Sequence, residues 1–275
     1  MSDHPSYLRV FATFARNSLV RDMTFRVNFI IDCVASLSWV SIQLAFYLLI
    51  FEFAPSIGLD GGWGKNEFLV FLATTLFANS LVGAFFMPNL SEFSELIRTG
   101  NLDFALLKPI DTQFLISFSR IEWSTLSNFI FALVLMVVAL LRFDVPPHPV
   151  QFLLYPVYLL CGVGMLYSLM IALSSLSVWL GRNQNLYDFW FYITNFSRYP
   201  MEIYEGTVGT PLRQVFTFLI PILVVVNVPA RILAQPLSAQ NWPLAAFALL
   251  VTVASLVGSR WLFLWALKSY RSASS

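Results

Sequence analysis

The chain has 275 residues, of which 58% are hydrophobic and only 11% are charged, against about 25% charged residues in an ordinary soluble domain. This composition excludes a water-soluble globule and favours a polytopic membrane protein. The net charge is +1 and the sequence has no basic run, so nucleic acid is not an expected partner.

Five apolar segments are clearly long enough to cross a bilayer core of ~30 Å as helices. They cover about residues 29–53, 67–87, 114–141, 150–180 and 243–267. The region from about 185 to 236 is also apolar, but it is interrupted by five prolines: Pro200, Pro211, Pro221, Pro229 and Pro236. It holds either one span with a re-entrant piece or two spans.

Cations flank the first and last spans. They are Arg9, Arg16, Arg21, Arg26, Lys268 and Arg271. The positive-inside tendency places both termini in the cytoplasm, which requires an even number of crossings. We therefore expect an all-α membrane protein in which residues 1–275 form one domain of six transmembrane helices. Asn185–Tyr204 is then the fifth span, and residues 211–236 form an external re-entrant segment before the last span.

The N-terminal region, residues 1–28, has a helical pattern. On one side Tyr7, Phe11 and Phe14 recur, with Leu8, Ala15 and Leu19 beside them; on the other side fall Arg9, Thr13 and Arg16. This pattern predicts a cytoplasmic amphipathic helix in the headgroup region with its apolar face toward the lipid. It is either a topology anchor or an elbow that transmits movement from a cytoplasmic partner to the spans.

The loop after the second span, residues 88–113, is cytoplasmic in this topology. Asn89 followed by Glu92 resembles a capping box, and it predicts a short helix at about residues 90–99. Gly100 is suited to end that helix because glycine tolerates positive φ. A second short turn must stop before Pro109, and Asp111 can cap the third span.

The charges of this loop are mixed in sign: Glu92, Glu95, Arg98, Asp103, Lys108 and Asp111. A lipid anchor would be basic, so the loop is either an ordinary solvated surface or a docking surface for a protein partner.

Two motifs carry a resemblance to a known family. The pattern Arg98-x-Gly100-x-Leu102-Asp103-x-x-Leu106-Leu107-x-Pro109 resembles a signature of the type-two ABC exporter permeases, in the branch of uncharacterised or viologen-exporter-like permeases. The run Arg198-Tyr199-Pro200-x-x-Ile203-Tyr204 is similar to a second landmark of that branch and is less specific. The resemblance covers almost the whole chain.

The resemblance implies that residues 88–113 hold the coupling helix, which sits in a cleft of a separate ATPase subunit. The candidate coupling residues are then Glu92, Glu95, Arg98, Gly100, Leu102, Asp103, Leu106, Leu107, Lys108 and Pro109. It further implies a multi-pass permease of the bacterial inner membrane, of the multidrug-efflux kind, which exports a lipophilic or amphipathic small molecule by alternating access. Its partners would be an ATPase subunit, membrane lipid, and a second permease that is either an identical or a related chain.

The residues themselves give no sign of catalysis. The stretch "GLDGGWGKN" departs from a phosphate-binding loop, because Lys65 is followed by Asn66 rather than Ser or Thr. There is no HExxH motif, Cys/His cluster or nucleophile elbow. We expect no enzyme activity, metal or bound cofactor in this chain, so ATP and Mg²⁺ would be used by the partner ATPase.

Charged residues at the spans are further candidates, because charge in a membrane is costly. Asp32 and Arg120 both lie near cytoplasmic span ends, so a structural ion pair between them is one expectation and separate solvated positions are the other. Asp188, Arg198 and Glu202 would fall near one face of a continuous fifth helix. That face, with Pro200 and Tyr204, would line a pathway or a subunit interface; the alternative is interfacial snorkelling.

Small residues of the fourth span, among them Gly162 and Gly164, predict close helix packing. Two other functional classes remain open. An ion-coupled secondary carrier would show internal repeats and acids near the bilayer midplane, which the sequence does not display. A non-transporting membrane scaffold would bind a partner other than an ATPase on the cytoplasmic loop.

Overall fold

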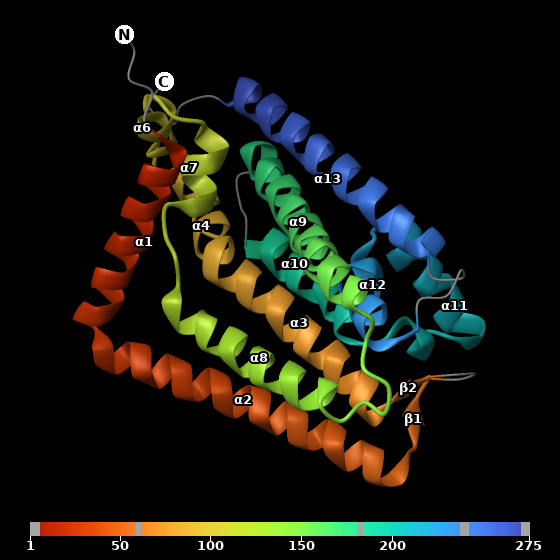
Figure 1. Ribbon diagram of the computed structural model, residues 1–275. Helices are drawn as coiled ribbons and strands as arrows, with labels where there is room; N and C mark the ends of the chain where they lie inside the picture. The colour runs from red at the N-terminus through yellow and green to blue at the C-terminus, as the bar shows by residue number, and fades with distance from the viewer. Residues whose placement is uncertain (1–5, 59–61, 181–183, 237–241, 271–275) are drawn as a thin grey trace.

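The computed structural model describes residues 6–58, 62–180, 184–236 and 242–270. It is a helical bundle in which long helices run from one end of the molecule to the other (Figure 1). The start of α1 (Tyr7–Thr24) and the end of α13 (Trp242–Ser269) lie at the end that carries the short helices α6 (Leu102–Leu106) and α7 (Thr112–Phe118). The opposite end carries the hairpin β1 (Ser56–Ile57) and β2 (Trp63–Gly64) together with α11 (Gly206–Gln214).

Five helical segments in the described part of the chain are long and apolar enough to span a membrane. They are α2 (Arg26–Phe53), α3 (Lys65–Phe85), η1 (Trp123–Thr125) with α8 (Leu126–Leu140), α9 (Pro149–Leu180) and α13 (Trp242–Ser269). The five clear segments predicted from the sequence are therefore confirmed. The third one begins at Trp123 rather than near residue 114, because α7 is separated from it by a non-helical stretch at residues 119–122.

Helix α3 is the centre of the bundle. Of its most apolar 18 residues, 78% are buried, whereas the corresponding value for α2 is 11%. It packs against α8, α9 and α12 (Ile222–Ala234). The exposed apolar side chains of α2 and α13 form the periphery, as expected for helices that face lipid or another subunit.

Close packing of the fourth span is confirmed. An ideal Cβ on Gly162 would lie 2.3 Å from the carbonyl oxygen of Val225, so α9 and α12 meet nearly backbone to backbone. Gly164 faces Thr252 and Leu256 of α13, and its ideal Cβ would come no closer than 3.6 Å to them. The two glycines therefore serve contacts of different tightness.

The predicted fifth span, Asn185–Tyr204, is wrong as a continuous helix. Helix α10 (Gln184–Asn195) has 12 residues, about 18 Å at 1.5 Å per residue, which is shorter than a bilayer core. The turns η2 (Phe196–Arg198) and η3 (Met201–Ile203) follow it. Tyr199 is extended, with φ −122° and ψ 145°, as is favoured before a proline. Pro200 thus ends the helix. The described residues contain five long candidate spans, or six if the bent pair formed by residues 206–234 counts as one.

The segment predicted to be re-entrant forms a sharply bent helix pair. Helix α11 continues into the π-helical turn η4 (Val215–Leu219), and α12 follows after a bend of 87°. Arg213 of α11 pairs with Glu205. At the other end of the pair, the carbonyl of Gln235 accepts from Gln151, which lies near the start of α9. Both ends of the bent pair thus lie at the hairpin end of the bundle (Figure 1).

Helix α1 (Tyr7–Thr24) meets α2 at a bend and runs crosswise toward α6 and α7 (Figure 1). Tyr7 contacts Phe114, while Phe11 contacts Phe85 and Phe118. The aromatic side therefore packs on α3 and α7, whereas Leu8 and Leu19, the apolar residues beside it, remain exposed. The expectation of a lipid-facing apolar side is thus wrong for the aromatic residues, because a helical wheel shows which residues share a face but not what that face contacts.

Candidate coupling surface

Four short helices lie between the second and third spans: α4 (Met87–Leu90), α5 (Phe93–Arg98), α6 and α7. Gly100 separates α5 from α6 with φ +73°, in the left-handed region that favours glycine, as its position predicted. The side chain of Asp111 accepts a hydrogen bond from Phe114 N at 3.0 Å, so Asp111 is a helix cap as predicted, but the helix that it caps is α7 and not the third span. This segment forms one end of the bundle, beside the start of α1 and the end of α13 (Figure 1).

The outer side of α5 and α6, which we call the coupling surface, mixes apolar and charged side chains. Leu107 is 81% and Phe104 is 68% exposed, far more than expected for large apolar residues beside a polar loop. The other exposed candidates are Glu92, Glu95, Arg98, Leu106, Lys108 and Pro109. Leu102 is fully buried, and Gly100 and Asp103 are half-buried. Leu102 therefore anchors the surface, while Phe104 belongs to it and was missed in the sequence.

Glu95 and Arg98 pair with each other on α5, with contacts of 2.5 and 2.8 Å. The hydrogen bond from Arg98 lowers the pKa of the Glu95 carboxyl. Both side chains are largely exposed, so this pair presents a fixed charge pattern to solvent and contributes little to stability.

The expected Asp32–Arg120 ion pair is wrong. Arg120 instead donates to Glu92 at 2.7 Å. The pair connects the segment between α4 and α5 to the segment between α7 and η1. Sequence reasoning missed this partner because Glu92 and Arg120 are 28 residues apart and only the fold brings them together.

Asn89 is buried and does not form the predicted capping box with Glu92. Its amide nitrogen donates to the carbonyl oxygens of Phe85, Ser117 and Arg120, at 2.7–3.0 Å. Its side-chain oxygen accepts from Ser119 Oγ at 2.7 Å and from Arg120 N at 2.8 Å. Asn89 therefore ties the end of the second span to the non-helical stretch before the third.

A polar network joins the cap of α7 to the last two spans. Arg260 of α13 donates to Asp111 at 2.5 and 3.1 Å and to Gln113 at 2.9 Å. Gln113 donates to Tyr167 OH of α9 at 2.9 Å, and that hydroxyl also bonds to Ser117 of α7. Arg260 was not singled out in the sequence, although a lone cation within an apolar span is a signal for such a partner.

Helix α1 is bonded to the same region. Ser18 Oγ accepts from Ile121 N at 3.0 Å, Asp22 accepts from Trp123 N at 3.3 Å, and Trp123 Nε1 donates to Ala15 O at 3.2 Å. The stretch between α7 and the third span is thus held from two sides, by Asn89 and by α1.

The candidates of the predicted fifth helix do not share one face. Asp188 is exposed on α10, and Arg198 lies in η2 with its guanidinium 5.6 Å from the ring centre of Phe191. Glu202 pairs with Arg231 of α12 and accepts from Trp63 Nε1 at 2.9 Å, which ties η3 to α12 and to the hairpin. Pro200 precedes η3, and Tyr204 OH donates to Phe196 O at 3.0 Å. Of these residues, Glu202 and Tyr204 stabilise the fold around the helix break.

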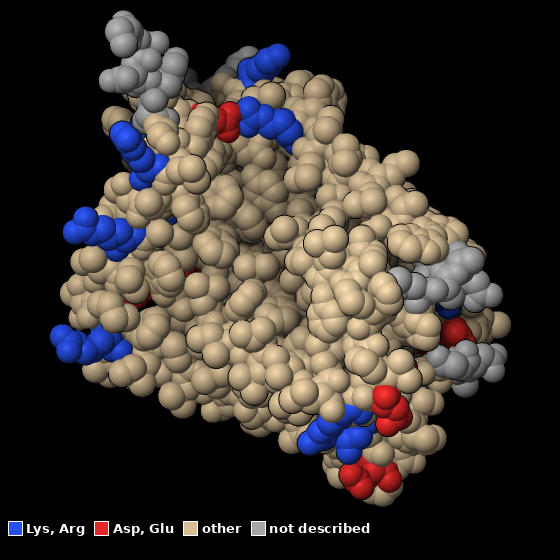
Figure 2. Space-filling view, viewed as in Figure 1, with Lys and Arg blue, Asp and Glu red and all other residues tan. Residues whose placement is uncertain are grey.

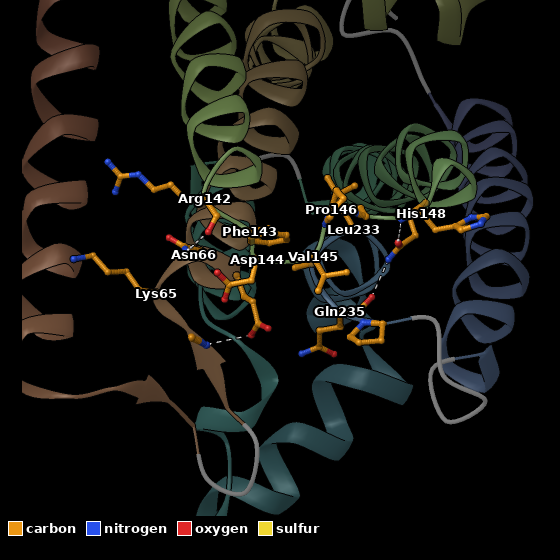
Figure 3. A pocket seen from close by; sticks show the side chains of 16 residues that line it. Lys65, Asn66, Arg142, Phe143, Asp144, Val145, Pro146, His148, Leu233 and Gln235 are labelled. Carbon is orange, nitrogen blue, oxygen red and sulfur yellow. Dashed lines mark hydrogen bonds between the residues drawn. The ribbon is translucent and has the colours of Figure 1, made fainter.

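A cavity of about 730 Å³ opens at the hairpin end, between the start of α3, the loop before α9 and the end of α12 (Figure 3). Asn66 closes one side by donating to Arg142 O at 2.9 Å. Lys65 extends toward α2, where it pairs with Glu52 at 3.7 Å. None of the predicted site residues lines this cavity.

The charges of the viewed face lie mostly at its margins, with a broad uncharged band between them (Figure 2). Together with the long apolar helices, this arrangement defines a multi-pass membrane protein with a polar surface at one end. A family profile described as "ABC-2 family transporter protein" matches residues 37–274. The chain therefore belongs to the ABC-2 transporter family, whose permeases generally work with an ATPase subunit. Neither the curated proteins nor the solved structures contain a match to the chain.

Proposed function

We propose that this chain is the permease subunit of an ATP-driven exporter, and that a separate ATPase subunit docks on the coupling surface. The observation that carries this proposal is the exposed set of Phe104, Leu107 and the charged residues of α5, at the end of a membrane bundle. Apolar side chains exposed beside charges are typical of a protein interface, where apolar contacts give affinity and charges give specificity.

The proposed topology places both termini and the coupling surface in the cytoplasm of a bacterial inner-membrane protein. Helix α1 is then an elbow at the cytoplasmic boundary. The bent pair α11–α12 enters from the outer side and returns to it, and α10 with η2 and η3 forms a broken sixth crossing. Both ends of the bent pair lie at the hairpin end, where Trp63 bonds to Glu202 just before α11 and Gln151 bonds to Gln235 just after α12, and this supports the arrangement. A broken helix at membrane depth is tolerated where protein surrounds it. Most residues of α12 are buried within the bundle and meet this condition.

Movement of the ATPase would reach three of the spans. The Glu92–Arg120 pair and Asn89 connect the coupling surface to the third span. The Asp111–Arg260 contact connects it to the last span, and Gln113 with Tyr167 connects it to α9. ATP and Mg²⁺ act in the partner, and these contacts convert its closure into alternating access between permease subunits.

The substrate class in this proposal is a lipophilic or amphipathic small molecule, by analogy with the viologen-exporter-like branch alone. A second permease, identical or related, completes the pathway, for which the exposed apolar faces of α2 and α13 offer surface.

The test is copurification from the native membrane of the wild type and of a variant with Phe104→Glu and Leu107→Glu. We expect an ATPase to copurify with the wild type and to be lost with the variant. Leu141→Glu is the matched control, because Leu141 is 80% exposed but follows α8 at the hairpin end of the bundle. Retention of the ATPase by the double variant would exclude the coupling surface as its docking site. Absence of any ATPase from the intact wild-type complex would favour the carrier or scaffold alternatives.

A further inference from the structure

The side of α1 that faces away from the protein is built differently from its packed side. At 100° per residue, Phe11, Phe14 and Ser18 point toward the bundle, which agrees with their contacts and burial. Arg9 and Arg16 are seven residues apart, so they point in nearly the same outward direction, about 10 Å apart along the axis. Both are exposed.

The two flanks of this arginine ridge are unlike each other. One flank is apolar and exposed, with Leu8 at 80%, Met23 at 41% and Leu19 at 39%. The other is polar and exposed: Thr13, Asn17 and Thr24. A cationic ridge between an apolar and a polar flank is the pattern of a helix that lies in the plane of a membrane surface.

The ridge also lacks compensating negative charge. Asp22 is the single acidic residue of α1, and it bonds inward to Trp123 N and to Arg21. Within the described part of the chain, neither Arg9 nor Arg16 forms an ion pair. Arg26, at the start of α2, adds a third exposed cation, and Figure 2 shows cations spaced along this edge of the molecule.

We propose that α1 binds anionic phospholipid headgroups through Arg9 and Arg16, with Leu8 and Leu19 inserted beside them at the acyl boundary. Arginine suits this partner because its planar fork pairs bidentately with phosphate oxygens. An acidic face of a protein would satisfy the arginines but would leave the apolar flank without a partner, so lipid fits the whole surface better. This inference concerns lipid recognition and does not depend on ATPase docking.

The test uses local fluorescence quenching in vesicles. A fluorophore is attached to Asn17→Cys, on the polar flank, in a background with Cys33→Ser and Cys161→Ser. The vesicles contain phosphatidylcholine and phosphatidylglycerol, and one of the two lipids at a time carries a nitroxide quencher near its headgroup. We expect phosphatidylglycerol to quench more strongly than phosphatidylcholine at equal mole fraction, with a preference that weakens as salt rises.

Arg9→Gln and Arg16→Gln should each reduce this preference by about fivefold, the ratio that corresponds to ~1 kcal/mol per basic residue near an anionic surface. The double variant Arg9→Lys with Arg16→Lys should keep most of the preference for phosphatidylglycerol. The matched control is Arg142→Gln, because Arg142 is an exposed cation at the hairpin end of the bundle. This variant should leave the lipid preference unchanged.

Equal quenching by the two lipids in the wild type, or a preference that survives removal of both arginines, would overturn the proposal. ATPase copurification with the same variants is expected to persist, so this proposal and the docking proposal fail independently.

Discussion

Arg260 and Asp111 are 149 residues apart in the chain, yet they form a two-point contact of 2.5 and 3.1 Å between the last span and the cap of α7. A cation within an apolar span is retained when a partner satisfies it. Because Asp111 also caps α7 through Phe114 N, one carboxylate serves both the helix start and the contact with α13.

Replacing either partner should uncouple the ATPase from transport. Arg260→Gln and Asp111→Asn are expected to abolish substrate-dependent export while the ATPase still copurifies, because the coupling surface itself is intact. The loss of stability should be modest, roughly 1 kcal/mol, since both side chains are about a third exposed. The double variant Asp111→Asn with Arg260→Gln tests the contact directly, since asparagine can still cap α7. A loss of stability no larger than that of either single variant supports the contact, and additive losses contradict it.

The same contact predicts a pH dependence of stability. Burial would raise the pKa of Asp111, but hydrogen bonds from Arg260 and from Phe114 N outweigh it and lower the folded pKa. Because the folded pKa of Asp111 is lowered, its carboxylate contributes its full share of the folding stability above the unfolded pKa of about 3.9. This stabilisation is lost as pH falls through the folded pKa. The Tm difference between wild type and Asp111→Asn in detergent should therefore stay constant from about pH 8 to 5 and shrink below about pH 4. A difference that changes between pH 8 and 6 would assign the effect to another group.

Asn89→Ala should destabilise the protein by about 2–3 kcal/mol, because it leaves buried carbonyl and amide groups without partners. Asn89→Asp puts a carboxylate oxygen against the same buried carbonyl oxygens, so it should destabilise at least as much as Asn89→Ala. Unfolding in detergent measures both effects. Ser91→Ala is the control: Ser91 is exposed and makes one local bond of 3.3 Å, so its removal should have little effect.

The two glycines of α9 form a matched pair for packing. Gly162→Ala should cost about 1–3 kcal/mol, because the added Cβ collides with the backbone carbonyl of Val225 and α12 must move. Gly164→Ala places its Cβ 3.6 Å from Thr252, an ordinary contact, and should be tolerated. Similar Tm values for the two variants would show that α12 adapts freely.

The topology can be tested with single cysteines in the background without Cys33 and Cys161. Val208→Cys on α11 and Phe104→Cys on α6 are both at highly exposed positions, 73% and 68%. In cells without the partner ATPase, which would cover Phe104, a membrane-impermeant maleimide should label the first and spare the second, and both should react after the membrane is opened. Labelling of Phe104→Cys from outside would invert the proposed orientation.

The features that could be predicted from sequence depend on short-range patterns. The five apolar segments, the positive φ of Gly100 and the Asp111 cap are set by residues within a few positions of one another. The Asn89–Glu92 spacing matched a capping box, but long-range partners took both side chains: Asn89 bonds to residues 117–120, and Glu92 pairs with Arg120. The effect of Pro200 on the predicted fifth helix could have been anticipated. The polar network around Arg260 could not, because its members come from three helices far apart in the chain.

The central position of α3 has a consequence for biogenesis. Helix α3 is synthesised before α8, α9 and α12, the helices that later enclose it. The growing chain must therefore hold α3 in lipid while its eventual neighbours are still unmade. Two threonines of α3 can remain in lipid during this interval because their hydroxyl groups donate within the helix. Thr74 donates to Val70 O at 2.8 Å, and Thr75 donates to Phe71 O at 3.0 Å. Insertion and enclosure of α3 are thus separable events, and the second completes only when α12 has emerged from the ribosome.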